Sequence, residues 1–376
     1  MKPYIFSILF LANISIAFSQ TKVEILNKNF PANENTILNL DLDNVAVVLE
    51  ESFDGKIHFD YNIFFGKYSK KKREAISKEV DVAVSKKNNL VSLKVNNSMY
   101  MGINHESDIS MDSLKVVLKD YVNYKKSNKF KYKTKDSIIT EIRNSSGSNL
   151  TDFIKRKKIN YEDNKVIRKN KMFVRVFKIK VPKNIQIKLK SINSTVIIRY
   201  DLNKKFTANT FKGNLKFKKI LAKENRIIAS NGIFQAEEIN NGRIEFLDMN
   251  KVVIGEMSNI SIATETSRIQ IGEIGENVDF NDFNSKLYLY NFSEKFTKFN
   301  LKGDYSELNL YNITKSNFSM DVFGHNTTLN MNETKTSFGL SKDKKLDKIL
   351  EKKVKLGTVS EGNIAIELRN GILNIK

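Results

Sequence analysis

The sequence predicts an all-β chain whose carboxy-terminal half is a β-solenoid or β-roll of repeated short strands. One observation is an apolar-alternating segment whose copies begin 17 to 21 residues apart. A second is that the copies keep one phase, as expected when each unit stacks on the previous one. A third is that polar turn residues punctuate the copies. A β-sandwich of the same strands is the alternative, because it uses the same turn chemistry.

The repeated segment reads apolar, any, apolar, any, any, apolar. Because side chains alternate across a strand, we expect one row to face a core and the other to face solvent. The first and last copies fit imperfectly, as terminal repeats commonly do. In register, the copies are VIIRYDL (196–202), LKFKKI (215–220), FQAEEI (234–239), VVIGEM (252–257), IQIGEI (269–274), LYLYNF (287–292), LNLYNI (308–313) and LNMNET (329–334).

A second alternating segment precedes each copy, as in residues 185–189 and 318–320, and a polar turn separates the two. These turns are rich in residues that tolerate positive φ or that bond to their own backbone. We therefore expect the strands to end there. The clearest turns are SNG (230–232), DMNK (248–251), TETS (264–267) and KGD (302–304).

The amino-terminal half, residues 20–120, is predicted to be β-rich but less regular. Strand patterns cover residues 36–42, 45–49, 56–61, 90–95 and 113–118, without a constant spacing. Residues 69–83 are compatible with a short helix that places Ala75, Ile76 and Val80 on one side. The regular strand pattern begins at residue 173, so the repeat region spans residues 173–376.

The first 19 residues have the features of a secretory signal peptide. Lys2 precedes an apolar run from Tyr4 to Ala17, and Ala17-Phe18-Ser19 forms an A-x-S cleavage site. That run is shorter than the ~20 residues that a membrane-spanning helix needs. We expect a protein exported to the periplasm or the cell surface, without a transmembrane segment.

Residues 344–355 place Leu346, Ile349, Leu350 and Val354 at helical spacing. This pattern predicts a helix that caps the open edge of the last repeat. A surface that contacts membrane headgroups is the alternative. The strands expected at 364–368 and 371–376 finish the chain inside the fold.

The chain is strongly basic, with 63 Lys and Arg against 42 Asp and Glu and a formal charge of +21. Such a surface attracts polyanions, although lysine that merely fills solvent-facing positions gives the same balance. Residues 121–172 are predicted to form a basic, partly mobile excursion, because they are rich in lysine and arginine and poor in ordered aliphatic pattern. Candidate polyanion contacts are Lys125, Lys126, Lys129, Lys131, Lys133, Arg156, Lys157 and Lys158.

The expected partners are an acidic glycan, envelope lipid headgroups or another envelope protein. Aromatic residues alternate with lysines between Tyr121 and Lys133, which is one signal of nucleic-acid binding. A strongly basic hairpin explains the same pattern more simply. A specific nucleic-acid site is therefore not expected.

Catalytic and metal-binding motifs are largely missing from the sequence. Cysteine is absent, which excludes disulfides and thiolate chemistry, and the three histidines, His58, His105 and His325, lie in different parts of the chain. No G-x-S-x-G motif occurs, and the two S-x-x-K matches, at Ser69 and Ser341, lack their companion signatures. We predict no catalytic serine, no metal and no cofactor.

One acidic row keeps an enzymatic alternative open. Glu238, Glu256 and Glu273 occupy the same position of three successive repeats, and stacked repeats would place them about 5 Å apart. Paired carboxylates at such distances cleave glycosidic bonds. A solvated corner row is the simpler interpretation, so a polysaccharide-processing enzyme on a β-helix is the second hypothesis.

The repeats, the segment VPKNIQIKLK (181–190) and the segment IAIELRNGILNIK (364–376) together resemble a bacterial adhesin-like β-strand-repeat family of unknown function. That family is common in envelope proteins of Bacteroidetes-type bacteria, and its members usually carry more glycine at the turns. The resemblance covers residues 173–376 and, less clearly, 36–118. It implies a β-solenoid or β-roll in the envelope, with adhesin-like binding or scaffolding, no established activity and no catalytic residues to carry over.

Overall fold

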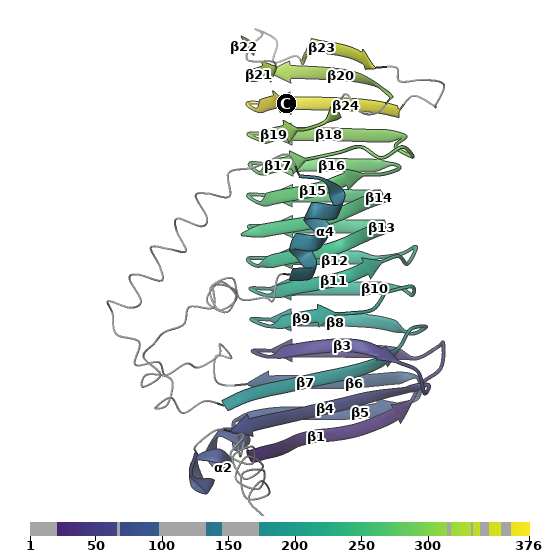
Figure 1. The fold of residues 1–376 in the computed structure, drawn as a ribbon, viewed down its shortest axis with the longest axis vertical. Helices are drawn as coiled ribbons and strands as arrows, with labels where there is room; N and C mark the ends of the chain where they lie inside the picture. Colours follow the sequence, from purple (N-terminus) through teal and green to yellow (C-terminus); the bar gives the residue numbers. More distant parts are fainter. Residues whose placement is uncertain are drawn as a thin grey trace, which may run out of the picture.

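The computed structural model describes residues 21–65, 68–97, 133–144, 173–313, 317–331, 334–338, 346–354 and 362–376. The predicted signal peptide and the strand expected at 113–118 lie outside these residues. The described chain is mostly β, and its strands belong to one large mixed sheet with many parallel neighbours (Figure 1). The sheet folds into two long parallel ladders.

The first ladder contains the strands that precede the turns. Neighbouring strands in it are parallel throughout. In spatial order they are β6 (Leu90–Asn97), β2 (Ile37–Asp43), β8 (Gln186–Ile192), β10 (Phe206–Phe211), β12 (Arg226–Ser230), the second halves of β13 (Ile233–Leu247) and β14 (Lys251–Glu265), β16 (Val278–Phe283), β18 (Lys298–Asp304), β24 (Gly362–Arg369) and β20 (Phe318–His325).

The second ladder contains the repeated segments and is also parallel. It runs without a break from the amino-terminal strands into the repeat region. In spatial order its strands are β7 (Phe173–Pro182), β3 (Ala46–Ser52), β9 (Thr195–Ile198), β11 (Asn214–Ile220), the first halves of β13 and β14, β15 (Arg268–Ile274), β17 (Lys286–Leu289), β19 (Glu307–Leu310), β25 (Ile372–Ile375) and β21 (Thr327–Met331).

Antiparallel strands close both ends of the ladders. At the amino-terminal end, β4 (Lys56–Phe65) pairs with β7 and β1 (Thr21–Pro31), and β5 (Val80–Lys87) pairs with β6. At the other end, β22 (Thr334–Phe338) pairs with β21, and β23 (Asp347–Val354) pairs with β20.

The register of the second ladder confirms the alignment of the repeats. Leu215 lies beside Val196 on one side and Phe234 on the other, and the row continues through Val252 and Ile269. These side chains are buried in one continuous apolar cluster that both ladders line. Alternation in the sequence thus produces the inward and outward rows that it predicts.

The corner between the ladders is built on a row of residues with left-handed backbone. The φ angles of Asn193, Asn231 and Asn284 are 48°, 55° and 55°. The backbone N–H of each donates a hydrogen bond to the carbonyl oxygen of the residue that ends the next strand of the first ladder. Asparagine tolerates this conformation better than most residues. Three of the predicted turns fall on this row. The turn expected at KGD (302–304) was wrong, because those residues lie in β18 and the corner is at Tyr305.

The last repeats do not stack in sequence order. Leu329 lies beside Leu373, and Leu373 lies beside Leu308, so β24 and β25 are inserted between the units that precede them in the chain. Figure 1 shows β24 between β18 and β20. The carboxy-terminal strands therefore lie inside the stack, as expected, although their place in the order was not foreseen.

The helix expected at 344–355 was wrong. Residues Asp347–Val354 form strand β23, and a bulge beside Val322 lets both Ile349 and Leu350 pack against the core. The edge of β20 needs backbone hydrogen-bond partners, and this requirement overrides the local helical spacing. A strand, not a helix, covers this edge.

The described residues contain two α-helices, α2 (Lys70–Lys78) and α4 (Lys135–Asn144). The first begins at Lys70, with Ser69 as its N-cap, close to the expected start, but it ends earlier than expected, because Val80 already belongs to β5. The second lies in the segment predicted as a mobile excursion. No helix among the described residues is long and apolar enough to span a membrane.

Candidate functional site

Two places on the ladders gather chemically active side chains, and the first is the face covered by α4. The helix lies along the stack, across β13, β14 and β15 (Figure 1). Ile138 and Ile142 are fully buried beneath it, in a cluster with Val253, Tyr290 and Tyr311. Because these isoleucines are four residues apart, they lie on one side of the helix.

Two glycines allow the helix to approach the ladder closely. A Cβ atom at Gly255 would lie 2.7 Å from Cγ1 of Ile139, and one at Gly272 would lie 3.2 Å from Cα of Lys135. Neighbouring repeats carry Glu237 and Tyr290 at this position. In this row, the two glycines therefore leave room for the helix between the side chains of Glu237 and Tyr290.

The acidic row predicted from the repeats is present. Glu238 lies beside Glu256 in the register, and Glu256 lies beside Glu273. Lys135 of α4 forms ion pairs with Glu256 and, at 3.3 Å, with Glu273. Lys219, from the preceding repeat, pairs with Glu238. Each carboxylate of the row thus has a cationic partner.

Further ion pairs hold the carboxy-terminal end of α4. Arg143 donates two hydrogen bonds to Glu237, at 2.9 and 2.8 Å, and Lys251 lies 2.7 Å from Glu141. Burial alone would raise the pKa of Glu141, but the charge of Lys251 and hydrogen bonds from Lys133 and Lys251 outweigh it, so its pKa is lowered. Glu141 is therefore a carboxylate at neutral pH, held within the interface.

Of the predicted polyanion contacts, the structure describes one. Lys133 forms an ion pair with Glu141 and precedes α4 directly, so its charge is engaged within the chain. The other predicted contacts, Lys125, Lys126, Lys129, Lys131, Arg156, Lys157 and Lys158, lie outside the described residues. Their role stays a prediction.

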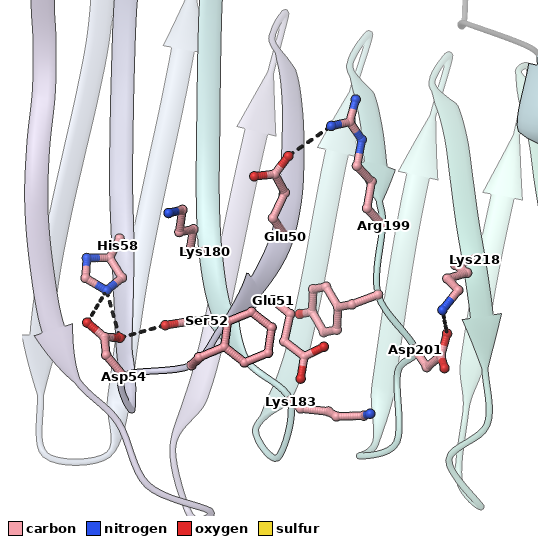
Figure 2. A pocket seen from close by; sticks show the side chains of 12 residues that line it. Glu50, Glu51, Ser52, Asp54, His58, Lys180, Lys183, Arg199, Asp201 and Lys218 are labelled. Atoms are coloured by element: carbon pink, nitrogen blue, oxygen red, sulfur yellow. Dashed lines mark hydrogen bonds and ion pairs between the residues drawn. The ribbon is translucent and has the colours of Figure 1, made fainter.

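The second place is an open groove of about 800 Å³ near the amino-terminal end of the second ladder. Sequence reasoning did not single out these residues, because β3, β4, β7 and β9 bring them together from distant parts of the chain. Figure 2 shows the lining side chains and labels ten of the twelve. The full lining is Glu50, Glu51, Ser52, Phe53, Asp54, His58, Lys180, Lys183, Arg199, Tyr200, Asp201 and Lys218.

Strand register explains why charges line this groove. Lys180 on β7 lies between His58 on β4 and Glu50 on β3, all on the outward side of the ladder. Two ion pairs continue the lining, Glu50 with Arg199 at 2.9 Å and Lys218 with Asp201 at 3.0 Å (Figure 2). Apart from His58, the lining therefore contains four acidic and four basic side chains, whose formal charges balance.

Ser52, Asp54 and His58 meet at one end of the groove, but in an order that does not activate the serine. Ser52 Oγ donates to Asp54 at 2.8 Å, and His58 Nε2 lies 2.9 Å from each Asp54 oxygen. The hydrogen bond with His58 lowers the pKa of Asp54. A catalytic triad places histidine between serine and carboxylate, whereas here the carboxylate is central. This cluster stabilises the turn between β3 and β4.

Three charged groups of the groove have no ion-pair partner within the described part of the chain. They are Lys180 and Lys183, which are exposed, and Glu51, which is half-buried. Phe53 projects from the turn with 90% of its side chain exposed, whereas Tyr200 is only 4% exposed. Burial raises the pKa of Tyr200, so its phenol stays neutral. The groove thus offers an aromatic ring, two free cations and one free carboxylate.

Comparisons with known proteins leave the family unassigned. No protein-family model and no curated protein matches the sequence. One solved structure that aligns is a putative cell adhesion protein from Clostridium sporogenes, at 8% identity and a TM-score of 0.18 over 95% of this chain and 99% of that chain. An overlap at this TM-score carries no argument about fold or function. Membership of the adhesin-like repeat family stays a prediction.

Metal chemistry finds no support in the described geometry. Across the residues that the structure places, no group of three or more His, Asp and Glu side chains converges. His58 is held by Asp54, and His325 is buried at the far end of the first ladder. His105 lies outside the described residues.

Proposed function

We propose that the chain is a non-catalytic exported protein of the bacterial envelope or cell surface, which uses the face of a β-solenoid for adhesin-like binding or scaffolding. The two parallel ladders around one core support the solenoid reading, because each repeat contacts mainly its neighbours. Such stacks present long, rigid surfaces of regularly spaced side chains. An acidic glycan, envelope headgroups and another envelope protein are the partners considered.

The proposal that the chain is non-catalytic rests on ion pairs in the acidic row. Glu238 pairs with Lys219, and Glu256 and Glu273 both pair with Lys135. A general acid needs a carboxyl group that no other side chain engages and that has access to substrate, and the ion pairs act against the first requirement. The helix α4 covers two of the three carboxylates, which acts against the second. The polysaccharide-processing alternative loses its motivation at this row.

The test of binding is retention of the purified mature chain on acidic glycans, vesicles of anionic envelope lipids and DNA, at low and at high salt. Retention of one class at high salt is the expected result, because a shaped site survives screening of long-range charge. Loss of every class at high salt would leave only a solvated basic surface and refute a specific binding role.

The enzymatic alternative has its own test. Glycan cleavage by the wild-type chain would be measured beside the variant with Glu238→Gln, Glu256→Gln and Glu273→Gln. We expect no cleavage by either protein. Cleavage that disappears in the triple variant would overturn the non-catalytic proposal.

A further inference from the structure

The groove between β4 and β11 carries an inference about the ligand, which rests on the proposed binding function. Its volume of about 800 Å³ falls in the range of roughly 300–1,000 Å³ typical of small-ligand sites. We infer that this groove binds a short carboxylated polysaccharide segment, with Lys180 and Lys183 on separate ligand carboxylates and Phe53 on the face of a sugar ring.

The two lysines provide the anion contact. Both are exposed, and neither forms an ion pair within the described residues, whereas Arg199 and Lys218 are already paired with Glu50 and Asp201. Lys180 lies on the outward side of β7 and Lys183 follows the end of that strand, so the two amines line different parts of the groove (Figure 2). A carboxylated saccharide that runs along the groove can therefore form one charge-assisted hydrogen bond at each lysine.

Phe53 provides the second element. Phe53 is 90% exposed, and covering its ring with a partner would gain hydrophobic free energy. Sugar rings present C–H groups on one face that pack on an aromatic ring, while their hydroxyls remain free to hydrogen-bond at the sides. The half-buried carboxylate of Glu51 is an acceptor for such hydroxyls.

The carboxylates of the groove argue against a nucleic acid. Glu50, Glu51, Asp54 and Asp201 line the same space as hydrogen-bond acceptors, and the phosphates of a nucleic acid offer them no donors, whereas the hydroxyls of a sugar do. A lipid headgroup would need more apolar surface for its chains than the single exposed ring of Phe53 provides. A saccharide with one carboxylate and several hydroxyl donors on each ring matches the mixed lining.

The experiment is calorimetric titration of the full mature chain with tetragalacturonate, with the same tetrasaccharide reduced to its neutral form, and with hexaglutamate. The acidic tetrasaccharide should bind at least about tenfold tighter than the neutral one, because charge-assisted hydrogen bonds are lost with the carboxylates. Tighter binding of hexaglutamate would overturn the saccharide assignment in favour of an acidic peptide.

Two variants assign the contact to the groove. Lys180→Ala with Lys183→Ala, and separately Phe53→Ala, should each weaken tetragalacturonate binding at least about tenfold. The matched control, Lys188→Ala with Lys223→Ala, removes the same charge outside the groove lining and should leave binding within about twofold. Circular dichroism of each variant confirms folding.

The outcomes separate this inference from the proposed function. If tetragalacturonate binds the wild type but both groove variants bind equally well, the groove assignment fails while a binding role stands. If tetragalacturonate does not bind while another glycan or lipid is retained, the ligand class fails. If no ligand of any class is retained, the proposed function fails as well.

Discussion

Asn374 Nδ2 donates a hydrogen bond of 3.0 Å to Oδ1 of Asn309, although 65 residues separate them in the chain. On its other side, Asn374 Oδ1 accepts one of 2.6 Å from Asn330. These three asparagines form a ladder on the outward side of β19, β25 and β21. A second row of side-chain hydrogen bonds, at the corner between the two ladders, joins Asn326 to Asn370 and Asn370 to Asp304. Side-chain bonds therefore hold the inserted carboxy-terminal strands on both sides.

Replacing Asn374 by alanine removes both hydrogen bonds of this ladder. We expect Asn374→Ala to lower the free energy of unfolding by about 2 kcal/mol, because each bond contributes about 1 kcal/mol. Urea denaturation followed by circular dichroism measures the change. Asn363→Ala is the control, since Asn363 is exposed on β24, and it should change stability by less than about 0.5 kcal/mol. Equal effects would show that the ladder is not formed.

Periodicity predicted the repeats well but could not predict the order of the last ones. The phase of apolar residues places Leu308 and Leu329 on equivalent positions, and it places Leu373 there equally well. Sequence alone has no means of deciding which of two equivalent units lies against Leu308. The choice depends on long-range pairing, including the antiparallel strands β22 and β23 that close the end.

The docking of α4 is expected to depend on its two buried isoleucines. A water-soluble carbodiimide joins lysines to carboxylates in contact, so it should couple Lys135 to Glu256 or Glu273 and Lys251 to Glu141. Ile138→Ala with Ile142→Ala should reduce these cross-links at least about tenfold, because each truncation of a buried isoleucine costs about 3 kcal/mol.

The control for this docking experiment is Thr140→Ala, which changes an exposed position of the same helix. Its cross-link yield, measured by mass spectrometry of the digested chain, should match the wild type. Undiminished cross-linking in the double variant would show that ion pairs alone hold the helix. The helix would then be held by the ion pairs of four basic side chains, namely Lys133, Lys135, Arg143 and Lys251.

Acid should release α4. The pKa of Glu141 lies below its ordinary value of 4.5 in the folded chain, so its pairing with Lys251 and Lys133 stabilises docking above about pH 4.5. This contribution is lost as the pH falls through the lowered pKa. Methyl NMR signals of Ile138 and Ile142 measure it, because release removes the ring-current shifts from Tyr290.

The variant Glu141→Gln isolates this effect. It should dock more weakly at neutral pH and change less than the wild type between about pH 5 and about pH 3, since the titrating group is gone. Identical acid responses of the two proteins would assign the release to the other carboxylates beneath α4.

The candidate sites were only partly visible in the sequence. The row of Glu238, Glu256 and Glu273 was predicted because it occupies one position of the repeat. The helix α4 that covers this row was not predicted, because it lies in a basic stretch without strand pattern. Two local signals were available: Ile138 and Ile142 at helical spacing, and Thr134 and Ser137, which cap the first turn. The groove gave no signal, since strand pairing alone unites Phe53, Lys180 and Arg199.

The corner row allows a stabilising substitution. Thr266 has φ of 48° at a position where Asn231 and Asn284 have the same left-handed conformation, which disfavours β-branched side chains. The Thr266 side chain is exposed, so its replacement sacrifices no packing. Thr266→Asn should therefore raise the free energy of unfolding by about 1 kcal/mol, and Asn284→Thr should lower it by a similar amount. Both changes would appear as opposite shifts of the urea midpoint at constant slope. A neutral Asn284→Thr would mean that the corner does not need the left-handed conformation in solution.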